Sequence, residues 1–239
     1  MRLILIRKRR LQMLVMFSIA IVVLNLLSLR YFAKEDMQNV DMSVLTGHSI
    51  VIDPGHGGID SGASRNNVIE KEITLAISKK LADVLQSHGA IVTFTRDSDI
   101  DYYTRGKGGK RKDLLTRISM MGSSGAEMFI SVHCNAYSDA SLSGSQVFYS
   151  PNFAQNKLLA ERLQQALVDF PPGNKRQVKE DKHILILNDT KMPGVLIETG
   201  YLTNHKEAVL LSDNTYQQKL VEQIAKGLAY HISRNEQDR

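Results

Sequence analysis

At positions 51–58 the sequence reads VIDPGHGG, and this stretch decides how the rest of the chain is interpreted. It predicts a short apolar strand that runs into a glycine-rich loop, with His56 just past the end of the strand. Pro54 fixes the backbone where the strand ends, and the glycines allow a ligand to approach the loop closely. A histidine with so few bulky neighbours is poorly suited to a hydrophobic core and well suited to binding a metal ion.

Two further apolar segments also end in a side chain that can bind a metal or move a proton. Residues 128–132 (MFISV) lead into His133, and residues 194–197 (GVLI) lead into Glu198. A lone histidine near a turn is usually an ordinary polar loop residue, but three such strands make coincidence the weaker explanation. In open α/β sheets, ligands bind outside the carboxyl ends of the strands. We therefore expect the three side chains at one edge of a sheet.

Strand and helix patterns alternate along most of the chain. Apolar or alternating segments predict strands at residues 48–53, 90–95, 127–132, 144–150, 184–187 and 195–198. Helical spacing of apolar residues predicts helices at residues 70–87, 114–121, 152–168, 204–211 and 214–232. This alternation predicts a single α/β domain with a mostly parallel, twisted sheet of about six strands and helices on both faces.

The N-terminus has the composition of a membrane anchor. Basic residues at positions 2 and 7–10 precede residues 11–29, which carry no charge and are mostly apolar. A helix of this length can cross a hydrocarbon core of about 30 Å, and the basic residues before it predict a cytoplasmic N-terminus with the remainder outside. A cleaved signal peptide is the alternative, but the sequence around Ser28 makes a poor cleavage site, which favours an uncleaved anchor.

The domain organisation and the charge balance follow from this anchor. Residues 1–29 are expected to form the transmembrane segment, residues 30–46 a mixed, aperiodic linker, and residues 47–235 the exported domain. The N-terminal cluster also accounts for the net charge of +5, because the remaining 25 basic residues balance the 25 acidic ones. A neutral domain argues against a nucleic-acid partner. Cys134 is the only cysteine, so no intramolecular disulfide can form, and the fold must rely on its core or on a metal.

One polar loop is unusually basic. Residues 105–112 contain Arg105, Lys107, Lys110, Arg111 and Lys112, interrupted by glycines. Such a pattern fits a solvated surface loop, and it also fits a contact with an anionic polymer or with a partner.

The residues at the strand ends match the donors of a zinc hydrolase. Such enzymes bind zinc through three protein ligands, often two histidines and a glutamate, and keep the fourth position for water. His56 and His133 would supply the imidazoles, and the third ligand would be Glu70 or Glu72, which follow the glycine-rich loop. A general base is then needed, and Glu198 has the right chemistry. Considered alone, a glutamate after an apolar strand more often makes a structural hydrogen bond.

Other kinds of site fit the sequence less well. There is no HExxH pattern and no Gly-Lys-Ser/Thr phosphate loop, and Asp60 would repel a phosphate. Cys134 is not expected to act as a nucleophile with His133, because adjacent strand residues point to opposite faces. Four further histidines are expected on the surface, namely His88, His183, His205 and His231.

Four motifs together resemble a known family. DPGHGG at residues 53–58, Glu70-Lys71, SVHCNA at residues 131–136 and ETGYLTN at residues 198–204 are similar to the motifs of the zinc-dependent N-acetylmuramoyl-L-alanine amidases of the amidase-3 family. The resemblance extends from about residue 48 to residue 231. It implies Zn²⁺ bound by His56, Glu70 and His133, with Glu198 as the catalytic acid/base. It also selects Glu70 over Glu72, which spacing alone leaves open.

The resemblance further implies an activity. Members of the family hydrolyse the amide between the lactyl group of N-acetylmuramic acid and L-alanine in peptidoglycan, and Asn135 would lie beside the metal or the substrate. The N-terminal anchor, the single domain and the basic loop are most similar to those of sporulation amidases. This similarity implies a role in spore-cortex maturation, in which muramic-δ-lactam forms, and hence in germination.

The same resemblance implies a location and partners. We expect the domain on the outer face of the cytoplasmic membrane, held there by its anchor, with the forespore intermembrane space as the specific compartment. Peptidoglycan is the expected partner, and the need for a protein partner or activator stays open. Two alternatives stay open. A zinc peptidase acting on the stem peptides would use the same four residues, whereas a non-catalytic peptidoglycan-binding module would not need Glu198.

Overall fold

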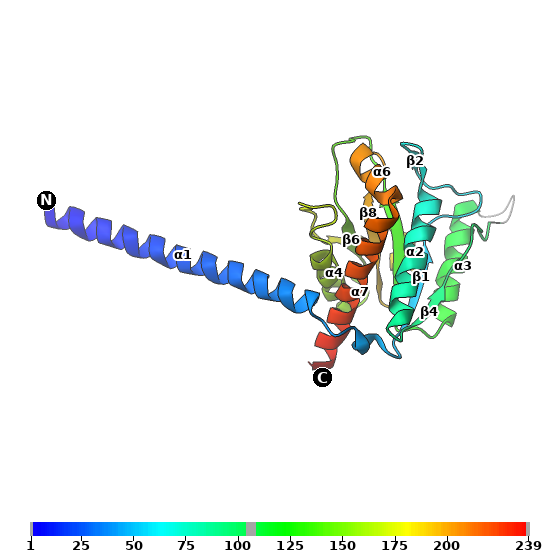
Figure 1. The fold of residues 1–239 in the computed structure, drawn as a ribbon, viewed down its shortest axis with the longest axis horizontal. Coiled ribbons are helices and arrows are strands. Elements are labelled where there is room, and N and C mark those ends of the chain that lie inside the picture. Colours follow the sequence, from blue (N-terminus) through cyan, green and yellow to red (C-terminus); the bar gives the residue numbers. More distant parts are fainter. Residues whose placement is uncertain (1, 104–108, 238–239) are drawn as a thin grey trace. The chain divides into compact units, whose positions relative to one another are not determined.

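The computed structural model describes residues 2–103 and 109–237. The chain forms two compact units, Met1–Val40 and Asp41–Arg239. The first unit is a single helix, and the second is an α/β fold that contains every residue predicted for the site (Figure 1).

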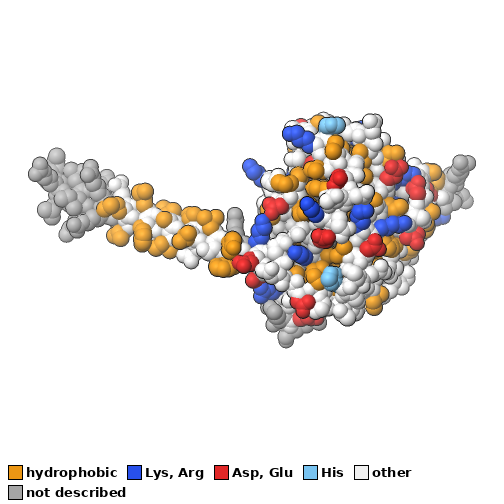
Figure 2. Space-filling view, in the orientation of Figure 1, with side chains coloured by type: hydrophobic (Ala, Val, Ile, Leu, Met, Phe, Trp, Pro, Cys, Tyr) orange, Lys and Arg blue, Asp and Glu red, His pale blue; other side chains and the backbone are white. Residues whose placement is uncertain are grey.

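Helix α1 (Arg2–Gln38) forms the first unit, and Figure 2 shows apolar side chains exposed along it. Its segment Leu11–Gln38 has a mean hydropathy of 2.2 in its most apolar window, so it is long and apolar enough to cross a membrane, a test that a signal sequence also passes. The expectation that residues 30–46 are aperiodic is wrong for residues 30–38, where the helix continues. This stretch contains neither glycine nor proline, and most of its residues favour helices.

The second unit is built on a six-stranded sheet with the strand order β4-β1-β5-β8-β6-β7. Its strands are β1 (Ser49–Pro54), β4 (Ile91–Phe94), β5 (Met128–Asn135), β6 (Gln146–Tyr149), β7 (Lys179–Glu180) and β8 (Gly194–Tyr201). Strands β4, β1, β5 and β8 are parallel, whereas β6 is antiparallel to β8 and carries β7 at the edge. A small separate hairpin consists of β2 (Ser64–Arg65) and β3 (Val68–Ile69). The predicted mostly parallel α/β sheet is confirmed.

Helices cover both faces of this sheet. They are η1 (Met42–Leu45, a 3₁₀-helix), α2 (Glu70–Ser87), α3 (Gly109–Ser123), α4 (Ala154–Ala166), α5 (Leu185–Asn188), α6 (His205–Ser212) and α7 (Asn214–Gln237). Helix α7 packs against α2 and α4 on one face, and α3 contacts α5 on the other. On the α3 face, Met121 packs in a cluster with Phe129 and Leu196 of the central strands. Because side chains alternate along a strand, His133 and Glu198 face this same side.

The predicted helix at residues 70–87 is confirmed as α2. Its apolar side chains at helical spacing are buried, namely Ile73, Ile77, Leu81 and Leu85. Gly89 follows the C-cap with a φ of +81°, a left-handed conformation that glycine adopts without strain. Glu70 is the first residue of the helix, so α2 places a predicted metal ligand at its N-terminus, where a carboxylate is favoured by the helix dipole.

The predicted strand at residues 184–187 is wrong, because these residues begin helix α5. A run of four apolar residues does not distinguish a strand from a buried helical turn. Asp181 starts the turn by accepting the N–H groups of His183 (2.7 Å) and Ile184 (2.8 Å) at its Oδ1. The sixth strand is instead β7, where the sequence predicts neither a strand nor a helix.

The expectation that His231 is exposed is also wrong. His88, His183 and His205 are exposed, but His231 lies on the inner side of α7 with 3% of its surface exposed. Burial, together with the charge of Arg162, lowers the pKa of His231 to about 4. It is therefore a neutral core residue, in keeping with the apolar stripe of α7.

Candidate metal and catalytic site

The glycine-rich loop turns His56 back over the end of the sheet. The amide of Gly55 donates to the carbonyl of Val132 at 2.9 Å, which continues the pairing of β1 with β5. His56 then has a φ of +61°, a left-handed conformation that is uncommon for a residue with a side chain. Mutual hydrogen bonds between the backbones of Gly57 and Asp60, at 2.9 and 3.0 Å, close the turn that follows.

Three predicted ligands converge at the end of this loop. The donor atoms of His56, Glu70 and His133 all lie within 4.8 Å of one another. Oε1 of Glu70 lies 3.1 Å from Nε2 of His56 and 3.2 Å from Nδ1 of His133. Two imidazoles and one carboxylate directed at a common point form a donor set suited to Zn²⁺.

Glu70 is held as a carboxylate. Its side chain is buried, and it accepts the N–H groups of Ala63 (2.8 Å) and Cys134 (3.0 Å). Burial alone would raise the pKa of Glu70, but the hydrogen bonds from His133 and His56 hold it well below its usual range. Glu72, the other candidate from spacing, is exposed on α2 and lies outside the cluster.

Two glycines leave the room that the donors occupy. A Cβ atom on Gly55 would lie 2.4 Å from Cε1 of His133. A Cβ atom on Gly62 would lie 2.6 Å from Oε2 of Glu70 and 2.7 Å from Cδ2 of His56. Any larger residue at these positions would displace a predicted ligand, so the loop is shaped around the donor set.

Asp60 supports His56 from the side away from the cluster. Its Oδ2 lies 2.9 Å from Nδ1 of His56, and its Oδ1 accepts from Nζ of Lys110 at 2.6 Å. A carboxylate at one ring nitrogen fixes the orientation of the imidazole and leaves the other nitrogen free to bind a metal. Sequence reasoning considered Asp60 only as an obstacle to phosphate. The signal that could have indicated its contact with the His56 ring is its position four residues after His56, across a tight turn.

Glu198 faces the same cavity from the next strand. It pairs in register with His133 across β5 and β8, and both line a cavity of about 460 Å³. Its Oε2 is buried and has no hydrogen-bond partner among the described residues. Burial raises the pKa of Glu198 to about 7, although the nearby imidazole of His133 opposes this shift. A carboxyl with this pKa can accept and release a proton near neutral pH.

The residues beside His133 have separate roles. Cys134 is buried, with its Sγ 3.2 Å from Oγ1 of Thr199. Burial, with the charge of Glu70, raises the pKa of the Cys134 thiol well above its usual value, so the thiol is not a nucleophile. Asn135 also lines the cavity that contains the cluster.

The basic loop is only partly described. Arg105 and Lys107 lie outside the described residues, whereas Lys110, Arg111 and Lys112 belong to the first turns of α3. Of these, Lys110 lines the cavity and contacts Asp60, so the end of this basic segment borders the cluster.

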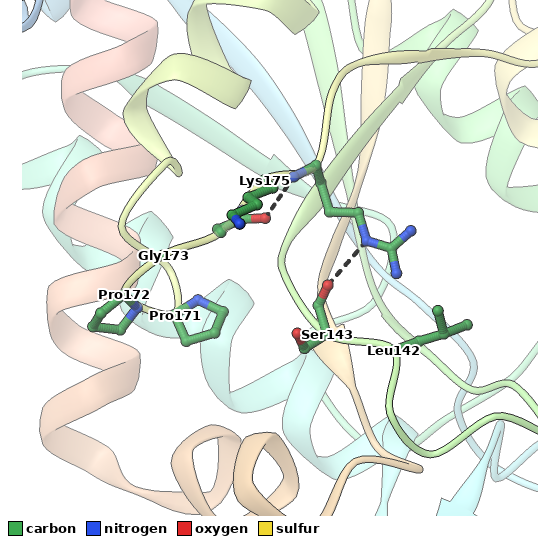
Figure 3. A pocket seen from close by; sticks show the side chains of 8 residues that line it. Leu142, Ser143, Pro171, Pro172, Gly173 and Lys175 are labelled. Atoms are coloured by element: carbon green, nitrogen blue, oxygen red, sulfur yellow. Dashed lines mark hydrogen bonds between the residues drawn. The ribbon is translucent and has the colours of Figure 1, made fainter.

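A second hollow, of about 520 Å³, lies between residues 142–143 and 171–176 (Figure 3). Arg176 joins the two loops, because its Nε donates to the carbonyl of Ser143 at 2.9 Å. None of the four predicted site residues lines this hollow, so it is separate from the donor cluster.

Comparisons with known proteins agree on one family. Residues 50–230 match the model of Amidase_3, described as N-acetylmuramoyl-L-alanine amidase. The germination-specific N-acetylmuramoyl-L-alanine amidase of Bacillus subtilis (strain 168) is 35% identical over 221 residues, which cover 91% of this chain and 93% of that protein.

Solved structures show the same likeness. The CwlD amidase from Clostridioides difficile, solved in complex with the GerS lipoprotein, aligns with a TM-score of 0.74 and 36% identity over 79% of this chain and 100% of that one. The catalytic domain of CwlV, an N-acetylmuramoyl-L-alanine amidase from Bacillus (Paenibacillus) polymyxa var. colistinus, aligns with a TM-score of 0.68 and 26% identity over 78% of this chain and 98% of that one.

Proposed function

Because the chain belongs to the Amidase_3 family of N-acetylmuramoyl-L-alanine amidases, we propose that it cleaves the amide between the lactyl group of N-acetylmuramic acid and L-alanine in peptidoglycan. In this proposal Zn²⁺ is bound by His56, Glu70 and His133, and Glu198 is the catalytic acid/base. The observation that carries it is the convergence of the three donors in one cavity with Glu198.

The residues present fit a zinc ion. The donor set is two imidazoles and one ionised carboxylate, the glycines leave space around them, and Asp60 supports His56 from behind. The Oε2 atom of Glu198 is buried and has no hydrogen-bond partner among the described residues, which leaves it available to a bound water or to the substrate. When bound, zinc would lower the pKa of a coordinated water and polarise the amide carbonyl.

Proton transfer in this proposal is carried out by a side chain of the protein. With a pKa of about 7, Glu198 can take the proton of the attacking water and pass it to the departing nitrogen of L-alanine. The leaving amine must be protonated, so one carboxyl can serve both steps in turn. Ile184, Ile186 and Leu196 line the same cavity and lower its polarity, which strengthens electrostatic interactions in the site.

We further propose a role in spore germination through cortex maturation, in which muramic-δ-lactam forms. The likeness to the germination-specific amidase of B. subtilis over nearly the whole of both chains supports this role. The apolar helix α1 supports attachment to the outer face of the cytoplasmic membrane, with the forespore intermembrane space as the compartment. Because the related CwlD amidase was solved in complex with a lipoprotein, a protein partner is part of the proposal.

The direct test is product analysis by mass spectrometry. Peptidoglycan would be incubated with the full-length protein in detergent, with zinc, with a chelator, or with the Glu198→Gln variant. We expect zinc-dependent release of stem peptides with a free L-alanine amino group, and a loss of about 10²–10⁴-fold in rate for Glu198→Gln. Peptides cut at other bonds would identify a zinc peptidase instead. Activity that persists in Glu198→Gln would reject the assigned role of this residue.

A further inference from the structure

We propose that Arg117, assisted by Arg96, is a positioning residue for the metal site, because the two buried guanidinium groups bind the three successive carbonyls of Pro54, Gly55 and His56. This inference rests on the proposed zinc site and adds to it residues that do not touch the metal or the substrate.

Arg117 reaches the loop from α3. Its Nη1 donates to the carbonyl of Pro54 at 2.7 Å, and its Nη2 makes a short hydrogen bond to the carbonyl of His56. Its Nε donates to Oδ2 of Asp113 at 2.9 Å, one turn earlier on the same helix. The side chain is 1% exposed. All three nitrogens of the guanidinium are therefore engaged, and two of them hold the loop.

Arg96 reaches the same loop from the end of β4. Its Nε donates to the carbonyl of Pro54 at 2.9 Å, and its Nη2 donates to that of Gly55 at 2.7 Å. Nη2 also donates to the carbonyl of Lys71 at 3.0 Å, in the first turn of α2. Arg96 therefore ties the loop that carries His56 to the helix that begins with Glu70.

The loop conformation explains why such support is needed. A left-handed backbone at a residue with a side chain is strained, and it persists only where the surroundings fix it. Arg96 holds the carbonyl of Gly55 and Arg117 holds that of His56, so the peptide groups on both sides of the His56 Cα are fixed, and Asp60 then fixes its ring. Both supports involve α3, because Lys110, which binds Asp60, belongs to the same helix as Arg117.

Charge pairing alone does not account for these arginines. Asp53, the buried carboxylate beside Arg117, also accepts the hydroxyl groups of Thr95 (2.5 Å) and Ser131 (2.6 Å). A lysine could neutralise the same carboxylate but lacks the planar fork that reaches several acceptors at once. The geometry of the fork is what matches the loop carbonyls.

The test measures zinc affinity, independently of catalysis. Zinc would be titrated into the metal-free, full-length protein in competition with a chromophoric chelator, for the wild type and for Arg117→Lys. We expect the variant to bind zinc about 10–100-fold more weakly, as is typical when support around a ligand is lost. Circular dichroism at the same temperature would establish that the variant is folded.

Arg162→Lys is the matched control. Arg162 lies on α4 and also donates to a backbone carbonyl, that of His231, at 2.9 Å, but it is not among the residues that line the metal cavity. The same substitution there should leave zinc affinity within about twofold, since it disturbs no support of the donor set. An equal loss of affinity in both variants would overturn the positioning role, because the effect would then be general.

Other outcomes of these experiments also test the positioning role of Arg117. A folded Arg117→Lys protein with wild-type zinc affinity would overturn the inference while the zinc site stands. If Arg117→Lys does not fold, Arg96→Lys is judged by the same comparison, and failure of both to fold would mean that the arginines support the fold and not the metal specifically. Undiminished zinc affinity in His56→Ala would instead reject the proposed zinc site itself.

Discussion

Two glutamates that line the same cavity are held in opposite states. Glu70 is surrounded by N–H donors and imidazoles, which keep its pKa low, whereas Glu198 has an unpartnered oxygen and a pKa raised to about 7. Environments that push two carboxyl pKa values apart separate a permanent anion from a group that can move a proton. The division between ligand and acid/base is therefore built into the surroundings of each side chain.

At the scale of one residue, Glu198 should make the stability of the metal-free protein fall as the pH rises. Its folded pKa is about 7, whereas an unfolded glutamate titrates near about 4.3. Between these pH values the folded state binds one more proton than the unfolded state. The contribution of Glu198 to the free energy of unfolding is therefore fully present below the unfolded pKa and is lost as the pH rises through 7. The shift corresponds to roughly 4 kcal/mol at most.

Urea unfolding measures this contribution. The chelator-treated wild type and Glu198→Gln would be compared at about pH 5 and about pH 8. The two proteins have all their other titrating groups in common, so only the contribution of Glu198 differs between them. The wild type should lose more stability over this interval than the variant, which cannot ionise at position 198. Parallel losses in the two proteins would show that Glu198 does not titrate in this range.

At the scale of elements, β8 and α6 together support the end of the sheet that carries Glu198. Glu207 of α6 accepts the N–H groups of Tyr201 and Gly144, both at 2.8 Å, which ties the end of β8 to the segment before β6. The helix itself starts at Asn204, whose Oδ1 accepts from the backbones of Lys206 (3.1 Å) and Glu207 (3.3 Å). The cap thus contributes indirectly to the edge of the site.

Removing this cap should destabilise the protein without affecting zinc affinity. We expect Asn204→Ala to cost about 1 kcal/mol and to lower the Tm by about 2–4 °C, because two amides lose their acceptor. Asn204→Asp retains the acceptor and should stay close to the wild type in thermal denaturation. If both variants lose the same stability, the loss belongs to the amide donor, which contacts the carbonyl of Leu142 at 3.2 Å, and not to the cap.

The elements that could be predicted are those whose signals are local. Apolar strands and the glycine-rich loop predicted the sheet and placed His56, His133 and Glu198 at one edge, whereas only the family resemblance selected Glu70 over Glu72. Helix α5 was missed because its apolar turn is too short to show a period. The continuation of α1 was missed because a change to polar composition does not by itself end a helix.

Contacts between distant parts of the chain could not be predicted in this way. Arg117 is 61 positions from His56, and Arg96 is 41 positions from Gly55. No period or motif connects these residues, since the contacts depend on which helix lies beside the loop and how far along it the arginine sits. The four motifs specify the donors, while the support behind them exists only in the folded chain.

At the scale of the whole molecule, the net positive charge comes from the first ten residues, and a long run of exposed apolar side chains follows them. Beyond the first ten residues the chain is neutral, and the large apolar side chains of α1 between Leu11 and Phe32 are exposed. The other unit shows acidic and basic side chains interspersed on the face seen in Figure 2. This arrangement favours membrane attachment through α1 over a charged docking surface on that visible face.

We therefore expect the full-length protein to remain in the membrane fraction after alkaline carbonate extraction. A variant carrying residues 41–239 behind a cleavable signal peptide should appear in the soluble exported fraction, because it lacks the apolar helix. Intact-mass measurement of the membrane-bound protein would check that α1 is retained. A mature chain shortened near Ser28 and released by carbonate would contradict the uncleaved anchor.

The buried Cys134 has a consequence for how the protein matures outside the cytoplasm. With one thiol, held neutral beside Thr199, the chain has no bridge to form or to rearrange. Its folding after export therefore needs no thiol oxidase or disulfide isomerase, and the folded protein should tolerate both oxidising and reducing surroundings. A cysteine introduced on the surface would be the single reactive thiol, so a dye could be attached at one chosen position without first removing Cys134.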